Sequence, residues 1–305
     1  MTLFDLPQLQ ETYDALPIEL RDTPLVRGRT RGLSLKLESL QPTGAYKIRA
    51  AWTALTRLGP EAKSRGAALS SSGNFAGAFT WAAHRLGIPA HLVFTPSVSG
   101  LKVELARHYP CTVHRCEDRY EARYELLATL QDQGIMTIDH RLDKNVFLGH
   151  ATIGWECAAR MSEFERVLIP LSTGGLAIGV ATALRLRGFS GEILGLQPSG
   201  NPTLYNSWRE GRPLQNQGTH TCCDALTATS VPEQVFEQLR KLLDDVLLVE
   251  ESSIKPAVRH LLAEEGILAE PGAAVGMAAI SEGQVPASGS LLIISGRNTA
   301  LDVLL

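Results

Sequence analysis

Short apolar runs alternate with longer amphipathic stretches along most of the chain. The apolar runs end in Gly, Ser, Pro or Asn, as buried strands often do, and lie in residues 66–74, 90–96, 111–116, 166–175, 192–198, 245–251 and 290–298. Stretches with apolar residues at helical spacing are 75–87, 120–134, 233–245 and 253–266, and Gly closes several of them. The alternation predicts an α/β fold with a parallel sheet and right-handed crossovers.

The charge balance limits the kinds of partner. The chain of 305 residues carries 29 Lys and Arg against 32 Asp and Glu, a formal net charge of -3. Because this balance creates no overall positive field, we expect neither a nucleic acid nor an anionic membrane as partner, but a small molecule. No apolar run approaches the ~20 residues that would span a bilayer.

Cysteine usage and the N-terminal composition bear on the compartment. The five cysteines are odd in number and lack CxxC spacing, so we interpret them as ordinary thiols in a reducing compartment. The first residues include acidic side chains and do not form a cationic start followed by an apolar core. We therefore expect a cytoplasmic protein.

Four segments carry candidate chemistry. Lys47 lies between a Pro-Thr-Gly turn and an apolar helical run, and "SSSGN" leads from a predicted strand into a helix. "STGG", residues 172–175, joins a strand to a small-residue helix whose N-terminus could hold a phosphate, and "SGRN", residues 295–298, follows the most hydrophobic strand. Taken singly, each segment also fits an ordinary turn or, for Lys47, a solvated surface charge.

Together and in this order, the segments resemble the fold type II pyridoxal-phosphate enzymes, the tryptophan-synthase-β-like group, and within it the serine/threonine dehydratase and serine racemase branch. The family's Lys-x-Glu-x-x-x-Pro-Thr-Gly-Ser-Phe-Lys-x-Arg-Gly-Ala motif is matched by Lys36, Glu38, Pro42, Thr43, Gly44, Ala45, Tyr46, Lys47, Arg49, Ala50 and Ala51. "GHATIGWE", "GLQPSG", "AEPGAA", "LYNSWREGRP" and "CCDAL" are similar to further family segments, so the resemblance covers almost the whole chain.

The resemblance implies two lobes with pyridoxal 5'-phosphate in the cleft between them. Residues 1–51 and 149–305 would form the large cofactor-binding lobe, and residues 52–148 a smaller lobe that closes over the substrate. It also implies a homodimer, as is common in the family.

The resemblance also assigns roles. Lys47 would be the Schiff-base lysine, Asn74 would bind the cofactor's 3-hydroxyl, Tyr46 would pack near its ring and Ser295 would bind its pyridine nitrogen. The phosphate would be held by Ser172, Thr173, Gly174, Gly175 and Leu176. The amino-acid substrate would be bound by Thr43, Ser71, Ser72, Gly73, Asn74 and Phe75.

The implied activity is β-elimination from a β-hydroxy amino acid such as L-threonine or L-serine, which yields a 2-keto acid and ammonia. Ser72 keeps a second activity open, because racemases of this branch have a serine there, on the cofactor face opposite the lysine. Racemisation would use Lys47 and Ser72 together as catalytic residues. A β-replacement synthase and a non-catalytic binding module remain further alternatives, whereas the absence of GxGxxG speaks against a nicotinamide-dependent dehydrogenase.

Some positions depart from the family pattern. Phe75 follows the Ser-Gly-Asn triplet, where His or Ala is frequent, and would narrow the mouth of the site. Arg297 replaces a glycine, and we expect its side chain to turn to the solvent. Gln197, Asn201 and Thr203 occupy the stretch where racemases carry metal-binding carboxylates, so we expect no metal.

Overall fold

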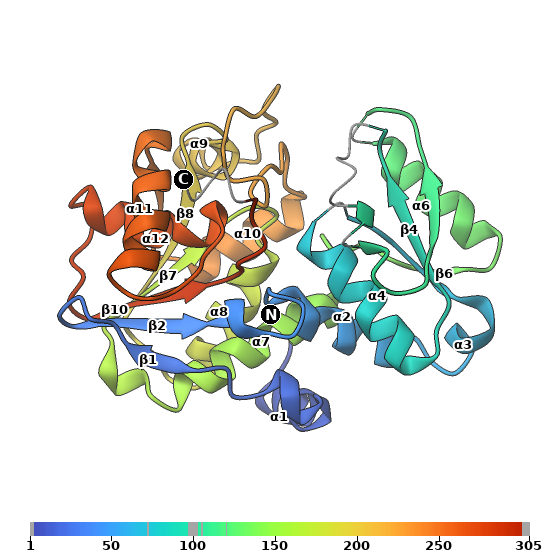
Figure 1. The fold of residues 1–305 in the computed structure, drawn as a ribbon, viewed down its shortest axis with the longest axis horizontal. Coiled ribbons are helices and arrows are strands. Elements are labelled where there is room, and N and C mark those ends of the chain that lie inside the picture. Colours follow the sequence, from blue (N-terminus) through green and yellow to red (C-terminus); the bar gives the residue numbers. More distant parts are fainter. Residues whose placement is uncertain (1–2, 72, 97–102, 105, 120, 301–305) are drawn as a thin grey trace.

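A computed structural model describes residues 3–71, 73–96, 103–104, 106–119 and 121–300. The chain forms an α/β structure with two separate sheets, each flanked by helices (Figure 1). The α/β architecture with parallel strands agrees with the sequence-based expectation.

The larger sheet has six strands in the order β1-β2-β10-β7-β8-β9. Its strands are β1 (Leu25–Arg27), β2 (Leu33–Leu37), β7 (Arg166–Pro170), β8 (Glu192–Pro198), β9 (Asp245–Val249) and β10 (Ser290–Ile294). All neighbouring pairs are parallel except β1 with β2, which puts an antiparallel strand at one edge. The sequence pattern predicted β7 to β10 but neither β1 nor β2.

Helices cover both faces of the larger sheet. On one face α7 (Lys144–Ala158), α8 (Gly175–Leu186) and α10 (Glu233–Leu242) pack with Val167 and Ile169 of β7, while on the other α11 (Glu251–Ala263) and α12 (Pro271–Ser281) pack with Leu168. The strand is buried from both sides, which explains why its sequence is a continuous apolar run without alternation. The remaining helices of the larger lobe are α1 (Leu6–Ala15) and α9 (Thr203–Glu210).

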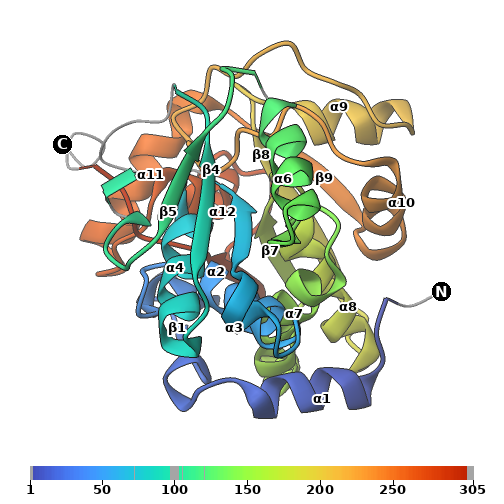
Figure 2. The same cartoon turned by 90° about the vertical axis from the view of Figure 1, so that its right-hand side faces the viewer.

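The smaller sheet has four parallel strands in the order β5-β4-β3-β6 (Figure 2). Its strands are β3 (Ala67–Ser70), β4 (Ala90–Phe94), β5 (Thr112–Arg115) and β6 (Met136–Ile138), of which β6 was not predicted. Its helices are α3 (Ala62–Arg65), α4 (Asn74–Leu86) and α6 (Ala122–Asp132). α6 packs on one face through Leu127 and Leu130, and α4 packs on the other.

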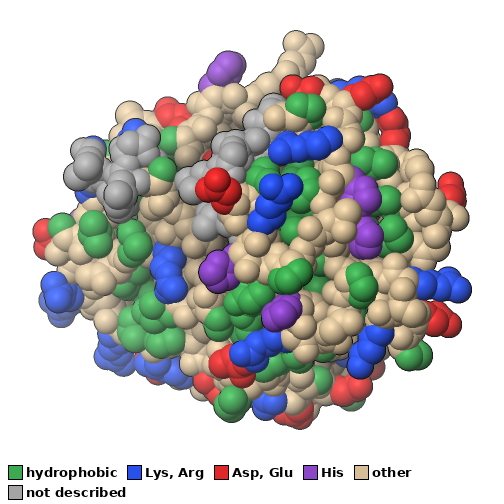
Figure 3. Space-filling view, turned by 45° about the vertical axis from the view of Figure 1, so that its right-hand side comes forward, with side chains coloured by type: hydrophobic (Ala, Val, Ile, Leu, Met, Phe, Trp, Pro, Cys, Tyr) green, Lys and Arg blue, Asp and Glu red, His purple; other side chains and the backbone are tan. Residues whose placement is uncertain are grey.

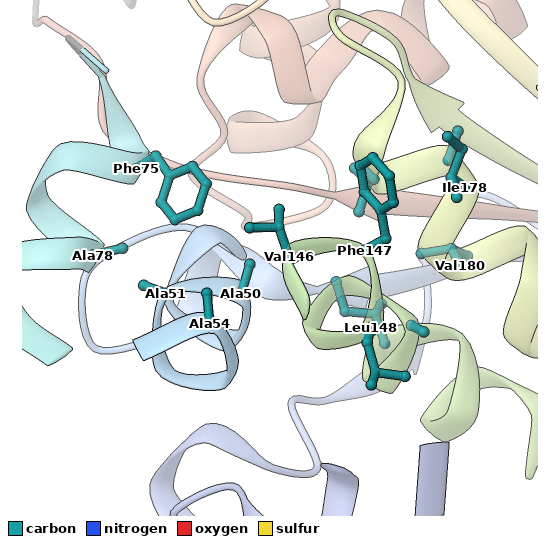
Figure 4. Packing of buried hydrophobic residues seen from close by; sticks show 14 of the residues in the cluster. Ala50, Ala51, Ala54, Phe75, Ala78, Val146, Phe147, Leu148, Ile178 and Val180 are labelled. Carbon is teal, nitrogen blue, oxygen red and sulfur yellow. The ribbon is translucent and has the colours of Figure 1, made fainter. Parts of the chain in front are cut away.

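The chain passes between the two sheets through α2 (Lys47–Thr56) and α7, which pack against each other. Gly149 of α7 permits this approach, because a Cβ atom there would lie 2.6 Å from the Ala50 Cα. Figure 4 shows Ala50, Ala51 and Ala54 of α2 near Val146 of α7. The predicted lobe boundaries fall within α2 and α7, so the division at those residues stays a prediction.

Further findings concern membrane-spanning helices, the cysteine thiols and the distribution of charge on the surface. Among the described residues, no helix combines the length and the apolar character needed to cross a bilayer. All five cysteines are free thiols. Basic and acidic side chains are interspersed over the face seen in Figure 3, in keeping with the near-neutral overall charge.

Candidate active site

The four candidate segments meet at one cavity of about 750 Å³. They reach it from the turn before α2, the loop between β3 and α4, the loop between β7 and α8 and the end of β10. Ligands of parallel α/β sheets bind beyond the carboxyl ends of strands, and three of these segments follow such ends. Of the sequence-predicted site residues, the cavity is lined by Thr43, Tyr46, Lys47, Ser71, Gly73, Asn74, Phe75, Ser172, Thr173, Gly174, Gly175, Leu176 and Ser295. Ser72 lies outside the described residues.

Lys47 is the first residue of α2, and the Pro-Thr-Gly turn directs it into the cavity. Gly44 adopts φ +76°, a conformation that L side chains rarely adopt. The Tyr46 N–H donates to the Ser295 carbonyl at 3.0 Å, which ties the start of α2 to the end of β10. The turn therefore brings the lysine beside the "SGRN" segment, although the two are remote in sequence.

The surroundings of the Lys47 amine favour its neutral form. Nζ lies 4.7 Å from the ring centroid of Tyr46 and 5.1 Å from that of Phe75. Burial lowers the pKa of Lys47 to about 7, although the Glu270 carboxylate acts in the opposite direction. The side chain retains some accessible surface, and that surface can face only the cavity that it lines. A large fraction of the amine is therefore unprotonated, and nucleophilic, near neutral pH.

Asn74 begins α4 and connects the two sides of the cavity. Its Nδ2 donates to both carboxylate oxygens of Glu270, at 2.8 and 3.0 Å, and its Oδ1 accepts from Asn298 Nδ2 at 2.9 Å. Glu270 caps α12 of the large lobe, whereas Asn74 follows β3 of the small sheet. A polar group that binds Asn74 must therefore share it with Glu270 or displace it.

The β7–α8 loop has the geometry of an anion-binding helix N-terminus. Gly174 caps α8 with φ +86°, and the loop residues that precede the helix line the cavity. The first N–H groups of a helix have no intrahelical acceptor and carry partial positive charge, so they can bind a phosphate without a basic side chain. A Cβ atom on Gly174 would lie 2.8 Å from Leu239 Cδ1, which leaves little room for any larger residue.

The expectation for Arg297 was wrong. Its side chain is half-buried, and its guanidinium donates a hydrogen bond to the Ser39 carbonyl instead of turning to the solvent. Its backbone N–H donates to the Gly44 carbonyl at 2.9 Å, so Arg297 also helps to hold the Pro-Thr-Gly turn. The arginine thus fixes the segment that follows Ser295.

Glu270 and His140 are two of the cavity residues that the sequence analysis did not name as site residues. Glu270 belongs to the quoted "AEPGAA" segment, which could have suggested it, and it is 2% exposed. His140 follows β6, and the cavity brings it near Lys47 without any motif to mark it. Its Nδ1 is buried and makes no hydrogen bond within the described structure. Burial, with the nearby charge of Lys47, lowers the pKa of His140 to about 3.

A buried ion-pair network holds α2 in place two residues beyond Lys47, at Arg49. The Arg49 guanidinium donates to the carboxylate of Glu38 at 2.9 Å and to that of Glu156 at 2.6 and 2.9 Å. Lys36 also donates to Glu156 and, at 2.6 Å, to the Thr23 carbonyl. Burial would raise the pKa of Glu38, but Arg49 and Lys36 outweigh it and hold that pKa low. Two cations and two anions balance, so the network links β2, α2 and α7 at no net charge.

The three residues at the racemases' metal position have structural tasks. The Gln197 amide oxygen accepts from the Leu204 N–H at 2.7 Å, and Thr203 donates to Asn201 at 2.9 Å. Asn201 Nδ2 donates to the Leu226 carbonyl at 2.8 Å. Leu226 lines the cavity, so these buried amides help to position its wall.

A two-lobed α/β fold with a buried lysine amine opposite a glycine-capped helix N-terminus defines an enzyme that can hold a phosphorylated aldehyde cofactor. The family model described as pyridoxal-phosphate dependent enzyme matches residues 17–296. The chain therefore belongs to this family, and its cofactor is pyridoxal phosphate. The amine, the anion-binding loop and the Asn74 and Ser295 side chains in one cavity suit the aldehyde, phosphate and ring substituents of that cofactor.

Similar proteins point to one branch of the family. The chain is 30% identical over 272 residues to the L-threonine ammonia-lyase of Thermotoga maritima, covering 88% of this chain and 68% of that protein. It is also 30% identical over 283 residues to the serine racemase of Arabidopsis thaliana, covering 90% and 85%. The structure of maize serine racemase matches with a TM-score of 0.90 at 28% identity, covering 98% of this chain and 95% of that one.

Proposed function

We propose that this enzyme eliminates the β-hydroxyl group of an amino acid such as L-threonine or L-serine and releases a 2-keto acid and ammonia. The observation that carries the proposal is the Lys47 amine, whose pKa is lowered to about 7 inside a cavity that also holds an anion-binding helix N-terminus. The similarity to a threonine ammonia-lyase supports this reaction.

In this proposal Lys47 has two successive roles. Its neutral amine would hold the cofactor through the aldehyde, and when free it would take the Cα proton of the substrate. A pKa near neutrality suits both steps, because the group must be unprotonated to attack and basic enough to accept a proton. The bound cofactor supplies an electron sink that stabilises negative charge at Cα.

The remaining cofactor contacts follow from position in the cavity. Residues 172–176 would hold the phosphate, Tyr46 would pack near the ring, and Asn74 would bind the ring hydroxyl in exchange with Glu270. Ser295 would bind the pyridine nitrogen. A neutral hydroxyl does not enforce a protonated ring as a carboxylate would, so it moderates the electron sink and favours elimination over transamination.

The substrate carboxylate would bind at the N-terminus of α4. The residues proposed for this are Thr43 and residues 71–75, and except for Ser72 they line the cavity. Loop N–H groups and hydroxyls before a helix of this length can hold a carboxylate. The carboxylate would then lie on the small-sheet side, and movement of the small lobe would exclude water.

Racemisation is the second candidate function, because a relative at 30% identity is a serine racemase. Lys47 and Ser72 would then exchange the Cα proton on opposite faces of the substrate.

The deciding experiment is a coupled keto-acid assay of purified holoenzyme with D- and L-threonine and D- and L-serine, followed by chiral analysis of the remaining substrate. Keto acid that disappears in Lys47→Ala but persists in the exposed-lysine control Lys63→Ala supports elimination. Accumulation of the opposite enantiomer without keto acid would replace elimination by racemisation. Incorporation of an added thiol into the product would point instead to β-replacement.

We also propose a cytoplasmic homodimer, which rests on the family resemblance and the free thiols. Light scattering of the purified protein tests the dimer, and cell fractionation tests the location.

A further inference from the structure

Three rings form part of the cavity wall on the side of the smaller sheet. Phe75 is the second residue of α4, Tyr124 lies on α6 and His140 follows β6, and all three line the cavity. The Phe75 and His140 ring centroids are 5.7 Å apart with an interplanar angle of 76°, an edge-to-face contact. The Phe75 centroid is also 5.1 Å from the Lys47 Nζ. The Phe75 ring, with His140 packed against it, therefore lies beside the proposed proton-transfer base.

The Tyr124 ring of this aromatic wall packs against an arginine that is itself paired with a carboxylate. The Arg141 guanidinium lies 3.3 Å from the Tyr124 ring centroid, and Asp139 accepts from Arg141 at 2.9 and 2.6 Å. Tyr124 and Arg123 line the cavity, whereas Arg141 is not among the described residues that line it. Figure 4 shows Phe75 facing the short side chains of α2. Rings fixed in this way offer a preformed surface, which lowers the entropic cost of binding another ring.

The charges on this side of the cavity do not favour an acidic ligand. Arg119 lines the cavity, but its guanidinium already donates to Glu117 at 2.9 Å and to Glu125 at 2.6 Å. His140 stays neutral because burial lowers its pKa. Arg123 also lines the cavity, as do His108 and Arg297, and the Arg123 guanidinium carbon lies 5.7 Å from the Tyr124 centroid. Acidic Asp118 lines the same cavity.

We propose that the aromatic wall of Phe75, Tyr124 and His140 binds an aromatic β-substituent, which makes 3-arylserines the preferred substrates. This rests on the proposed elimination at Lys47, because the substituent is carried by Cβ, which is bonded directly to the carbon that loses its proton. For 3-phenylserine, the Cα–H and Cβ–O bonds break and water leaves. The enamine formed takes up one water and releases ammonia, so the net products are phenylpyruvate and ammonia.

The first test compares kcat/KM of the holoenzyme for both 3-phenylserine diastereomers, L-threonine and 3-hydroxyaspartate. We expect phenylserine to exceed threonine by ~10- to 150-fold, the range that burial of a phenyl-sized group provides. Threonine turned over faster than phenylserine would overturn the proposal and leave the elimination intact. Hydroxyaspartate as the best substrate would also overturn it and assign the specificity to Arg123.

A binding measurement separates the aromatic wall from the reaction. L-Phenylalanine and L-alanine lack a β-hydroxyl leaving group, so their dissociation constants, read from the cofactor's absorption spectrum, report binding alone. We expect phenylalanine to bind about tenfold tighter or more. If neither phenylserine nor threonine is eliminated but phenylalanine binds tighter, the proposed reaction fails and the aromatic site stands. Equal binding of the two overturns the aromatic site.

Variants at Tyr124 test the wall itself. Tyr124→Leu removes the ring and should reduce the phenylserine-to-threonine ratio of kcat/KM by about tenfold, whereas Tyr124→Phe keeps the ring and should preserve the ratio. The ratio is independent of the fraction of folded enzyme, so a folding defect does not imitate the effect. Equal ratios in Tyr124→Leu and the unaltered enzyme would remove Tyr124 from the proposed wall.

Discussion

Replacing Glu156 by Gln should destabilise the protein strongly, because it breaks the neutrality of the buried network around α2. Glu156 accepts from both Lys36 and Arg49, and the three side chains are 5%, 1% and 0% exposed. Its loss leaves two buried cations facing the single carboxylate of Glu38. Breaking a buried pair in this way costs about 3–5 kcal/mol.

The expected change in melting temperature follows from the chain length. An unfolding entropy of ~2.1 cal/mol/K per residue over 305 residues gives about 0.64 kcal/mol/K, so Tm should fall by about 5–8 °C. Thermal unfolding of the holoenzyme followed by circular dichroism measures this directly.

Two further variants make the test specific. Glu192→Gln removes an exposed partner of Arg166. It should lower the free energy of unfolding by at most about 1 kcal/mol, because the Glu192 side chain is largely exposed to solvent. Adding Lys36→Met to Glu156→Gln restores charge balance, so the double variant should recover part of the lost Tm. The reasoning is refuted if Glu156→Gln melts no lower than Glu192→Gln, or if the two losses in the double variant simply add.

Further predictions concern the lysine, its neighbour and the helix packing. Because the pKa of Lys47 is about 7, the neutral fraction of its amine rises from about a tenth at pH 6 to about nine tenths at pH 8, and cofactor incorporation into protein stripped of it should accelerate about tenfold. Glu270→Gln removes the carboxylate that raises this pKa, so the midpoint of the same absorbance-monitored profile should move to lower pH. Gly179→Ala would place a Cβ atom 2.6 Å from the Phe147 carbonyl oxygen and should lower the unfolding free energy, measured in urea, by about 1–3 kcal/mol. An unchanged profile in Glu270→Gln, or an unchanged urea midpoint in Gly179→Ala, would contradict the corresponding prediction.

The sequence predicted the buried strands well because both faces of those strands are covered. It missed β2, where Ser34 and Lys36 interrupt the apolar pattern although both are buried. The lysine interrupts the apolar pattern of the sequence, and its burial is explained by Glu156, remote in the chain, and by the Thr23 carbonyl. β1 and β6 have three residues each and give too short a pattern for recognition.

The candidate site was predictable where a few adjacent residues carry the signal. Lys47, the glycine-rich loop and Ser295 belong to local motifs, and all of them line the cavity. His140 and Tyr124 come to the cavity only through the tertiary arrangement of the smaller sheet. The direction of Arg297 likewise depends on the Ser39 carbonyl, whose position no local pattern encodes.

The packing of α2 against α7 has a mechanical consequence. Both passages of the chain between the sheets run through these two adjacent helices, so a rotation of the smaller sheet relative to the larger one would turn about them. Displacement in a rotation grows with distance from its axis. Lys47 begins α2, and the network around Arg49 fixes that helix to the larger sheet. A rotation of the smaller sheet would therefore move the loop before α4 and the aromatic wall relative to an amine that stays nearly still.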